Sequence, residues 1–111
     1  MKHDQQGKCQ ISIILPVYNH ERWVCEAIDS VVEQSYNDWE LLIIDDASCD
    51  NSWAVLQNHL QSLQRMQPHL RIQCIRHEHN QGAPATINQG LQLATGDYLT
   101  ILNSDDVWDS T

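Results

Sequence analysis

Short apolar runs alternate with longer amphipathic segments along most of this chain. Four runs have the length of β-strands and are rich in Ile, Leu or Val: residues 10–15, 40–44, 70–75 and 98–102. The segments between them repeat apolar residues every three to four positions, which is the period of a helix with one buried face. This alternation predicts βαβ units with right-handed crossovers, and therefore a parallel sheet covered by helices on both faces.

Local signals predict where the three helices begin and end. Asn19 is expected to cap the first helix, and residues 48–52 offer capping side chains for the second, which should end before Pro68. Gly82 and Pro84 are expected to open the third helix, which Gly96 closes. The residues expected to face inward on the third helix are Ile87, Leu91 and Ala94.

The charge of the chain restricts its partners. Six Lys and Arg stand against fifteen Asp and Glu, giving a net charge of -9, which argues against nucleic acid as a partner. A diphosphate bound here would need a metal cation for neutralisation. With 111 residues, no apolar run of membrane-spanning length and four scattered cysteines, we expect one domain with reduced thiols and a cytoplasmic location, although a longer protein could be membrane-associated. Residues 1–9 are expected to form a polar extension.

Two strands run into pairs of carboxylates. Asp45 and Asp46 follow the second strand, and Asp105 and Asp106 follow the fourth. Ligands of open parallel sheets bind beyond the carboxyl ends of the strands, so these pairs predict one pocket with Mg²⁺ or Mn²⁺ and a phosphorylated ligand. Because side chains alternate in a strand, only Asp46 of the first pair need enter the pocket, where it could accept the imide N–H of uracil. Alternatively, Asp45, Asp46 and Ser48 only cap and turn the chain.

Other residues have competing interpretations. Tyr18 could line a base pocket, and Asn19 could contact a ligand or cap a helix. The motifs Asn80-x-Gly82 and Asn88-x-Gly90 place small residues where a helix must approach the sheet or a ligand closely. Zinc binding by Cys74, His77 and His79 is disfavoured because a fourth ligand at suitable spacing is missing. Three tryptophans are expected to be packing anchors, and these are Trp23, Trp39 and Trp53.

Taken together, these motifs resemble the nucleotide-binding half of family 2 glycosyltransferases, which have the GT-A fold. The likeness covers nearly all of residues 11–108 in order and spacing. The matching pieces are Pro16-Val17-Tyr18-Asn19, Ala27-Ile28-x-Ser30-Val31 with Gln34, Trp39-Glu40-Leu41, Ile44-Asp45-Asp46-Ala47-Ser48-x-Asp50, Asn80-x-Gly82-Ala83, Asn88-x-Gly90-Leu91, Ala94-Thr95-Gly96-Asp97-Tyr98 and Ser104-Asp105-Asp106-Val107-Trp108.

The resemblance implies a Rossmann-like three-layer sandwich of GT-A type, with strand order 3-2-1-4. It implies that residues 10–111 form the donor-binding half of a truncated glycosyltransferase domain, which transfers a sugar with inversion from a nucleotide-diphosphate sugar, commonly a UDP-sugar, to a glycan or lipid-linked acceptor. The metal ligands it implies are Asp105 and Asp106. The nucleotide-binding residues it implies are Pro16, Val17, Tyr18, Asn19, Asp45, Asp46, Asn88, Ser104 and Asp105.

Two departures from the family pattern bear on activity. Asn103 stands where many members carry an Asp, which removes one charge from the metal site. The general base of the family lies downstream of Thr111, so no catalytic residue is expected within this chain. Two alternatives stay open, a metal-dependent nucleotidyltransferase and a non-catalytic nucleotide-binding or interaction module. The fourth strand is expected to present an open edge, through which two copies could associate.

Overall fold

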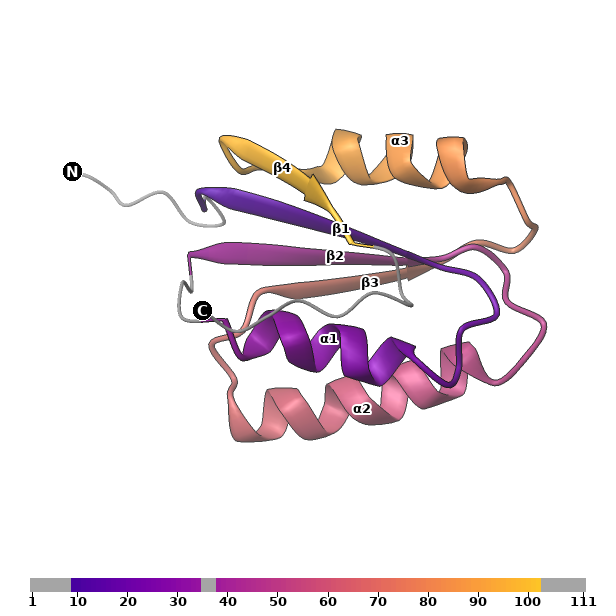
Figure 1. Ribbon diagram of the computed structural model, residues 1–111, viewed down its shortest axis with the longest axis horizontal. Coiled ribbons are helices and arrows are strands. Elements are labelled where there is room, and N and C mark those ends of the chain that lie inside the picture. Colours follow the sequence, from indigo (N-terminus) through magenta and orange to yellow (C-terminus); the bar gives the residue numbers. More distant parts are fainter. Residues whose placement is uncertain (1–8, 35–37, 103–111) are drawn as a thin grey trace.

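The computed structural model describes residues 9–34 and 38–102, which form one parallel sheet and three helices (Figure 1). The strand order β3-β2-β1-β4 confirms the expected order. In chain order the elements are β1 (Ile11–Val17), α1 (Val24–Val32), β2 (Trp39–Asp45), α2 (Ser52–Met66), β3 (Ile72–Arg76), α3 (Ala83–Leu93) and β4 (Tyr98–Ile101).

The helices cover the sheet in the two layers that right-handed crossovers require. In Figure 1, α1 and α2 lie together on one face of the sheet, and α3 lies on the other. Alternate residues of β1, namely Ile13, Leu15 and Val17, belong to the main core beneath α1 and α2. Ile14 points to the opposite face, where a Cβ placed on Gly90 of α3 would lie only 2.7 Å from its Cγ2 atom. The expected close approach of this helix to the sheet is confirmed.

The inward face of α3 differs from the expected one. Thr86 and Gly90 are its buried residues, whereas Leu91 is 40% exposed. Because Gly90 has no side chain, the helix rests on the sheet along its Thr86–Gly90 stripe and turns Leu91 outward. The prediction of an inward Leu91 is wrong for this reason.

The first strand extends beyond its predicted end, and the first helix begins later than predicted. Pro16 does not close β1, which continues to Val17 and pairs there with Asp45 of β2. The helix α1 starts only at Val24, and Asn19 has a left-handed backbone with φ of 57°. Asn19 is therefore not the cap of this helix. Its side chain is used elsewhere, as described below.

The expected packing role of the three tryptophans is confirmed for two of them. Trp39 is buried and Trp53 packs against the core, but Trp23 is 40% exposed and contacts His20 edge-on. Cys9, which was assigned to the polar extension, is buried, and residues 1–8 lie outside the described part of the chain. All four cysteines are free thiols. Among the described residues, no helix has the length and apolar character needed to cross a membrane.

Candidate functional site

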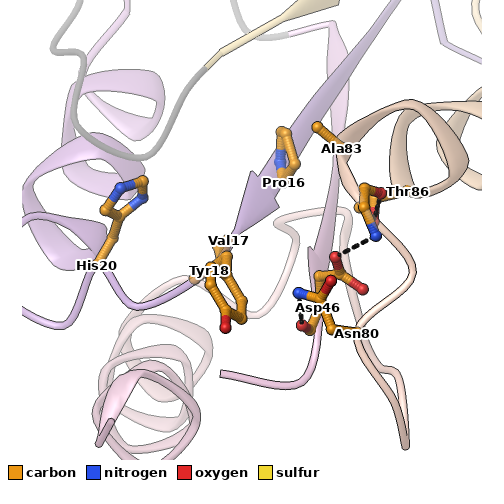
Figure 2. A pocket seen from close by; sticks show the side chains of 9 residues that line it. Pro16, Val17, Tyr18, His20, Asp46, Asn80, Ala83 and Thr86 are labelled. Carbon is orange, nitrogen blue, oxygen red and sulfur yellow. Dashed lines mark hydrogen bonds between the residues drawn. The ribbon is translucent and has the colours of Figure 1, made fainter. Parts of the chain in front are cut away.

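A cavity of about 360 Å³ opens at the carboxyl ends of β1 and β2 (Figure 2). This is the edge at which open parallel sheets bind their ligands. The lining residues come from the end of β1 and its loop, from the end of β2, and from the segment that leads into α3. They are Pro16, Val17, Tyr18, His20, Asp46, Asn80, Gly82, Ala83 and Thr86.

Asp46 is the acidic residue of this cavity, and backbone N–H groups hold its carboxylate. The side chain is 6% exposed. Its Oδ1 accepts a hydrogen bond from the backbone N–H of Gln81 at 2.8 Å, and its Oδ2 accepts one from that of Gly82 at 2.9 Å. Asn80 donates its side-chain amide to the backbone carbonyl of Asp46 at 3.2 Å. The segment before α3 thus wraps around Asp46, and Gly82 permits this with a φ of 92°.

A buried imidazole completes the surroundings of Asp46. His77 follows directly after β3, and its Nδ1 lies 2.8 Å from Asp46 Oδ1. Its Nε2 contacts the Oε1 of Gln89, a residue of α3. Burial disfavours the charge on Asp46, but the hydrogen bonds from His77, Gln81 and Gly82 outweigh it and lower the pKa of this carboxyl.

The contact that lowers the pKa of Asp46 raises the pKa of His77. Burial disfavours the charged ring of His77, but its bonds to Asp46 and Gln89 outweigh burial and raise its pKa. The contact between the two side chains therefore favours the protonated form of the imidazole and the ionised form of the carboxylate. The sequence offered no signal for this contact, because the two residues are 31 positions apart and polar residues are common where strands end.

Asp45 stabilises the turn after β2, which is the local role proposed as the alternative for both acids, although it caps no helix because α2 begins only at Ser52. It is fully buried, and its Oδ1 accepts from the hydroxyl of Ser48 at 2.6 Å while its Oδ2 accepts from the backbone N–H of Ser48 at 3.0 Å. Arg76 Nε lies 3.7 Å from Oδ2. Asp45 is not among the residues that line the cavity. Alternation along the strand thus directs only Asp46 to the cavity, as the pattern predicts, whereas Asp45, which the resemblance places among the nucleotide-binding residues, lies away from it.

Asn19 ties together the two loops beside the cavity. Its Oδ1 accepts hydrogen bonds from the backbone N–H groups of Cys49 at 2.7 Å and Asp50 at 3.3 Å, and its own N–H donates to the Ser48 hydroxyl at 2.9 Å. Asn19 does not line the cavity itself. It fixes the loop that carries Tyr18, so its contribution to the site is positional.

The structure brings together four of the expected nucleotide-binding residues, which are Pro16, Val17, Tyr18 and Asp46. Asn88 is exposed on α3 and is not among the lining residues. Ser104, Asp105 and Asp106 lie outside the described residues. The last described residue before them, Leu102, is buried and donates its backbone N–H to Ile14 at 2.9 Å, so the chain leaves β4 beside β1.

Sequence reasoning did not identify His20 and Thr86 as lining residues, because neither belongs to a motif with a chemical role. Within residues 9–34 and 38–102, no group of three or more His, Cys, Asp or Glu side chains has an arrangement that could hold a metal ion. The zinc alternative thus has no support among these residues, and both ring nitrogens of His77 have other partners.

An open parallel sheet with a cavity at the carboxyl ends of its strands is typical of Rossmann-like nucleotide-binding folds. Within this class of fold, the similar solved structures are GT-A glycosyltransferases. The mannosyltransferase PcManGT from Pyrobaculum calidifontis, in complex with GDP-Man and Mn²⁺, superposes with a TM-score of 0.82 at 23% identity, over 95% of this chain and 30% of that one. TarS 1–349 from S. aureus, in complex with UDP, superposes with a TM-score of 0.71 at 28% identity, over 88% of this chain and 28% of that one.

The chain belongs to glycosyl transferase family 2, whose model matches residues 12–111. It is 41% identical over 98 residues to the putative colanic acid biosynthesis glycosyl transferase WcaA of Escherichia coli K12, covering 88% of this chain and 33% of the relative. It is 37% identical over 98 residues to the E. coli UDP-Glc:alpha-D-GlcNAc-diphosphoundecaprenol beta-1,3-glucosyltransferase WfgD, covering 88% and 36%. The chain thus spans about a third of the length of these relatives.

Proposed function

We propose that this chain is the donor-binding part of an inverting glycosyltransferase that uses a UDP-sugar and acts on a glycan or lipid-linked acceptor. The observation that carries the proposal is the state of the Asp46 carboxylate. It is ionised, it lines the cavity, and three of its roughly four acceptor positions are taken by His77, Gln81 and Gly82. Counted over the part of the chain that the structure describes, Oδ2 retains one acceptor position for a ligand.

This free position favours a base with an N–H donor. Uracil presents its imide N–H at N3, whereas cytosine presents a bare acceptor at the same place, and an ionised carboxylate repels such an acceptor. Tyr18 and Pro16 supply apolar surface on the wall of the same cavity, against which a base can pack. The names of two similar proteins mention UDP or UDP-Glc, which agrees with this choice of donor.

A divalent cation, Mg²⁺ or Mn²⁺, belongs to the proposal as well. Asp105 and Asp106 offer the carboxylate oxygens that these hard cations prefer, and Leu102 leads the chain toward them from the strand beside β1. When bound, the cation would neutralise charge on the diphosphate leaving group. The net charge of -9 favours neutralisation of a diphosphate by such a cation, and the similar mannosyltransferase was solved with Mn²⁺.

Thermal unfolding with added nucleotides tests this function. UDP with Mn²⁺ at one hundred times its Kd should stabilise the chain by ~2.7 kcal/mol, which corresponds to a rise in Tm of about 10 °C for a domain of this size. CDP should raise the Tm less, and UTP should do no better than UDP. A stronger response to nucleoside triphosphates would favour a nucleotidyltransferase, and no response to any nucleotide would favour an interaction module.

We also propose that two copies associate through β4. Tyr98, Leu99 and Ile101 of this strand are 63%, 51% and 46% exposed, and β4 lies at the edge of the sheet next to β1. An exposed apolar edge of this kind favours pairing with a second chain. Sedimentation at rising concentration should reveal a dimer, and a strict monomer would contradict the proposal. The four free thiols fit a reducing, cytoplasmic location, which we propose for this domain.

A further inference from the structure

We propose that His77 is a positioning residue for base selection, which holds the Asp46 carboxylate so that Oδ2 is the atom that reads the nucleobase. The proposal rests on the donor-binding function proposed above. It concerns a residue that does not line the cavity, and the side-chain contact that joins His77 to a lining residue is the one with Asp46.

The two oxygens of the Asp46 carboxylate differ in how many hydrogen bonds they already accept. Nδ1 of His77 and the N–H of Gln81 both meet Asp46 Oδ1, each at 2.8 Å, so the two acceptor positions of this oxygen are filled. Among residues 9–34 and 38–102, Oδ2 meets only the N–H of Gly82, at 2.9 Å. The free acceptor position therefore belongs to Oδ2. Without the imidazole, the carboxylate would have a free position on each oxygen and could rotate between them.

Burial, a backbone hydrogen bond and a contact with α3 hold His77 in place. The residue is 7% exposed, and its backbone N–H extends the ladder between β2 and β3 by donating to Asp45 at 2.9 Å. On the far side of the ring, Gln89 of α3 accepts from Nε2. The ring is thus fixed between the end of β2 and the third helix, and it transmits that fixed position to Asp46.

Nearby charges also act on the His77 ring. The acidic groups that act on the ring are Asp46, its direct partner, and Asp45, whose charge adds to the field, while Gln89 contributes a neutral oxygen. Nδ1 of His77 lies beside the Asp46 carboxylate and Nε2 lies beside the side-chain amide of Gln89, and both contacts favour the charged form of the ring. A charged donor is a stronger partner than a neutral one, and it keeps Asp46 in the ionised form that only accepts hydrogen bonds.

Two substitutions separate positioning from simple packing. His77→Leu fills most of the space of the ring but donates nothing to Asp46. His77→Asn fills less space but places its amide N–H₂ where Nδ1 was, which restores the donor. If His77 only fills space, Leu should be the better replacement; if it positions Asp46, Asn should be.

The measurement is the ratio of the Kd for CDP to the Kd for UDP, each titrated calorimetrically with Mn²⁺. Because a charged hydrogen bond to Asp46 is lost, His77→Leu should lower this ratio about tenfold, mainly by raising the Kd for UDP. His77→Asn should stay within about threefold of the wild-type ratio. The ratio is insensitive to the fraction of folded protein, so partial unfolding of a variant does not hide the effect. His79→Gln, at an exposed histidine two residues further on, is the matched control and should leave the ratio unchanged.

The ring titration of the nucleotide-free chain gives a second, independent readout. In the wild type, the His77 ring should titrate above its ordinary pKa of 6.5, and Asp46→Asn should lower that pKa. The proposal would be overturned if His77→Leu left the ratio of the Kd for CDP to the Kd for UDP unchanged, or if this ratio were higher in His77→Leu than in His77→Asn. The donor-binding function would stand in either case. A wild-type chain that binds no UDP would overturn the donor-binding function, and the reading role with it.

Discussion

Replacing Asp46 by Asn tests the site through its contribution to stability. A carboxylate meets three N–H donors here, and an amide has only one oxygen with which to meet them. The best orientation of Asn places that oxygen at the Oδ1 position, where it keeps His77 and Gln81. Its N–H₂ group then faces the N–H of Gly82, where Oδ2 was 2.9 Å away. The N–H of Gly82 is left unpaired, and the other two hydrogen bonds exchange a charged acceptor for a neutral one.

These losses set the expected magnitude. An unpaired, partly buried N–H costs at least ~1 kcal/mol, and the exchange of a charged acceptor for a neutral one costs ~1 kcal/mol for each of two bonds. The free energy of unfolding should therefore fall by about 3 kcal/mol, which moves the midpoint of urea unfolding by about 2 M. Asp38→Asn is the control, because Asp38 is half exposed and its nearest cation, on Arg71, is 3.9 Å away.

The control should lose less than about 1 kcal/mol, as expected of an exposed ion pair. If Asp46→Asn unfolds at the same urea concentration as the Asp38 variant, the network around Asp46 does not hold this edge of the sheet. The derivation of the free acceptor position on Oδ2 would then fail with it.

Three further predictions concern packing and pH. Gly90→Ala should lower the free energy of unfolding by about 1–3 kcal/mol, because the new Cβ meets the side chain of Ile14, which can shift. Gly96→Ala should cost more by urea unfolding, because its Cβ would lie 2.8–2.9 Å from backbone atoms, and equal losses would contradict this. The stability due to ionised Asp46 is complete above pH 3.8 and lost as the pH falls through its lower folded-state pKa. The stability due to protonated His77 is complete below pH 6.5 and lost as the pH rises through its higher folded-state pKa. Asp46→Asn should therefore weaken the dependence of the free energy of unfolding on pH in both the acidic and the neutral range.

The fold was predictable because every level of the sequence favours the same arrangement. Apolar strands and amphipathic helices alternate, and the family resemblance supplied the strand order that the structure confirms. Helix starts were less predictable, because a residue such as Asn19 suits a helix cap and a loop equally well. Only the fold brings residues 48–50 near enough to bind the Asn19 side chain, and this contact decides its role.

The site was predictable to the extent that it depends on position along a strand. Alternation in β2 separates Asp45 from Asp46 and sends only Asp46 to the cavity. The partners of Asp46 were not predictable, because His77 and Gln81 come from later segments that meet it only after β3 and α3 have packed. A sequence pattern thus identified the carboxylate, while its ionisation and its free oxygen depend on tertiary contacts.

Nuclear magnetic resonance mapping of UDP binding to the ¹⁵N-labelled chain, with Mg²⁺, tests the central claim most directly. If Asp46 receives the base, the largest shifts of backbone amide signals should belong to Tyr18 and Gly82, which line the cavity, and to Gln81, whose N–H binds Asp46; CDP should shift these signals less. Signals of α2, on the other face of the sheet from α3, should stay in place. Shifts that gather on α2 instead, or equal shifts with UDP and CDP, would contradict the account.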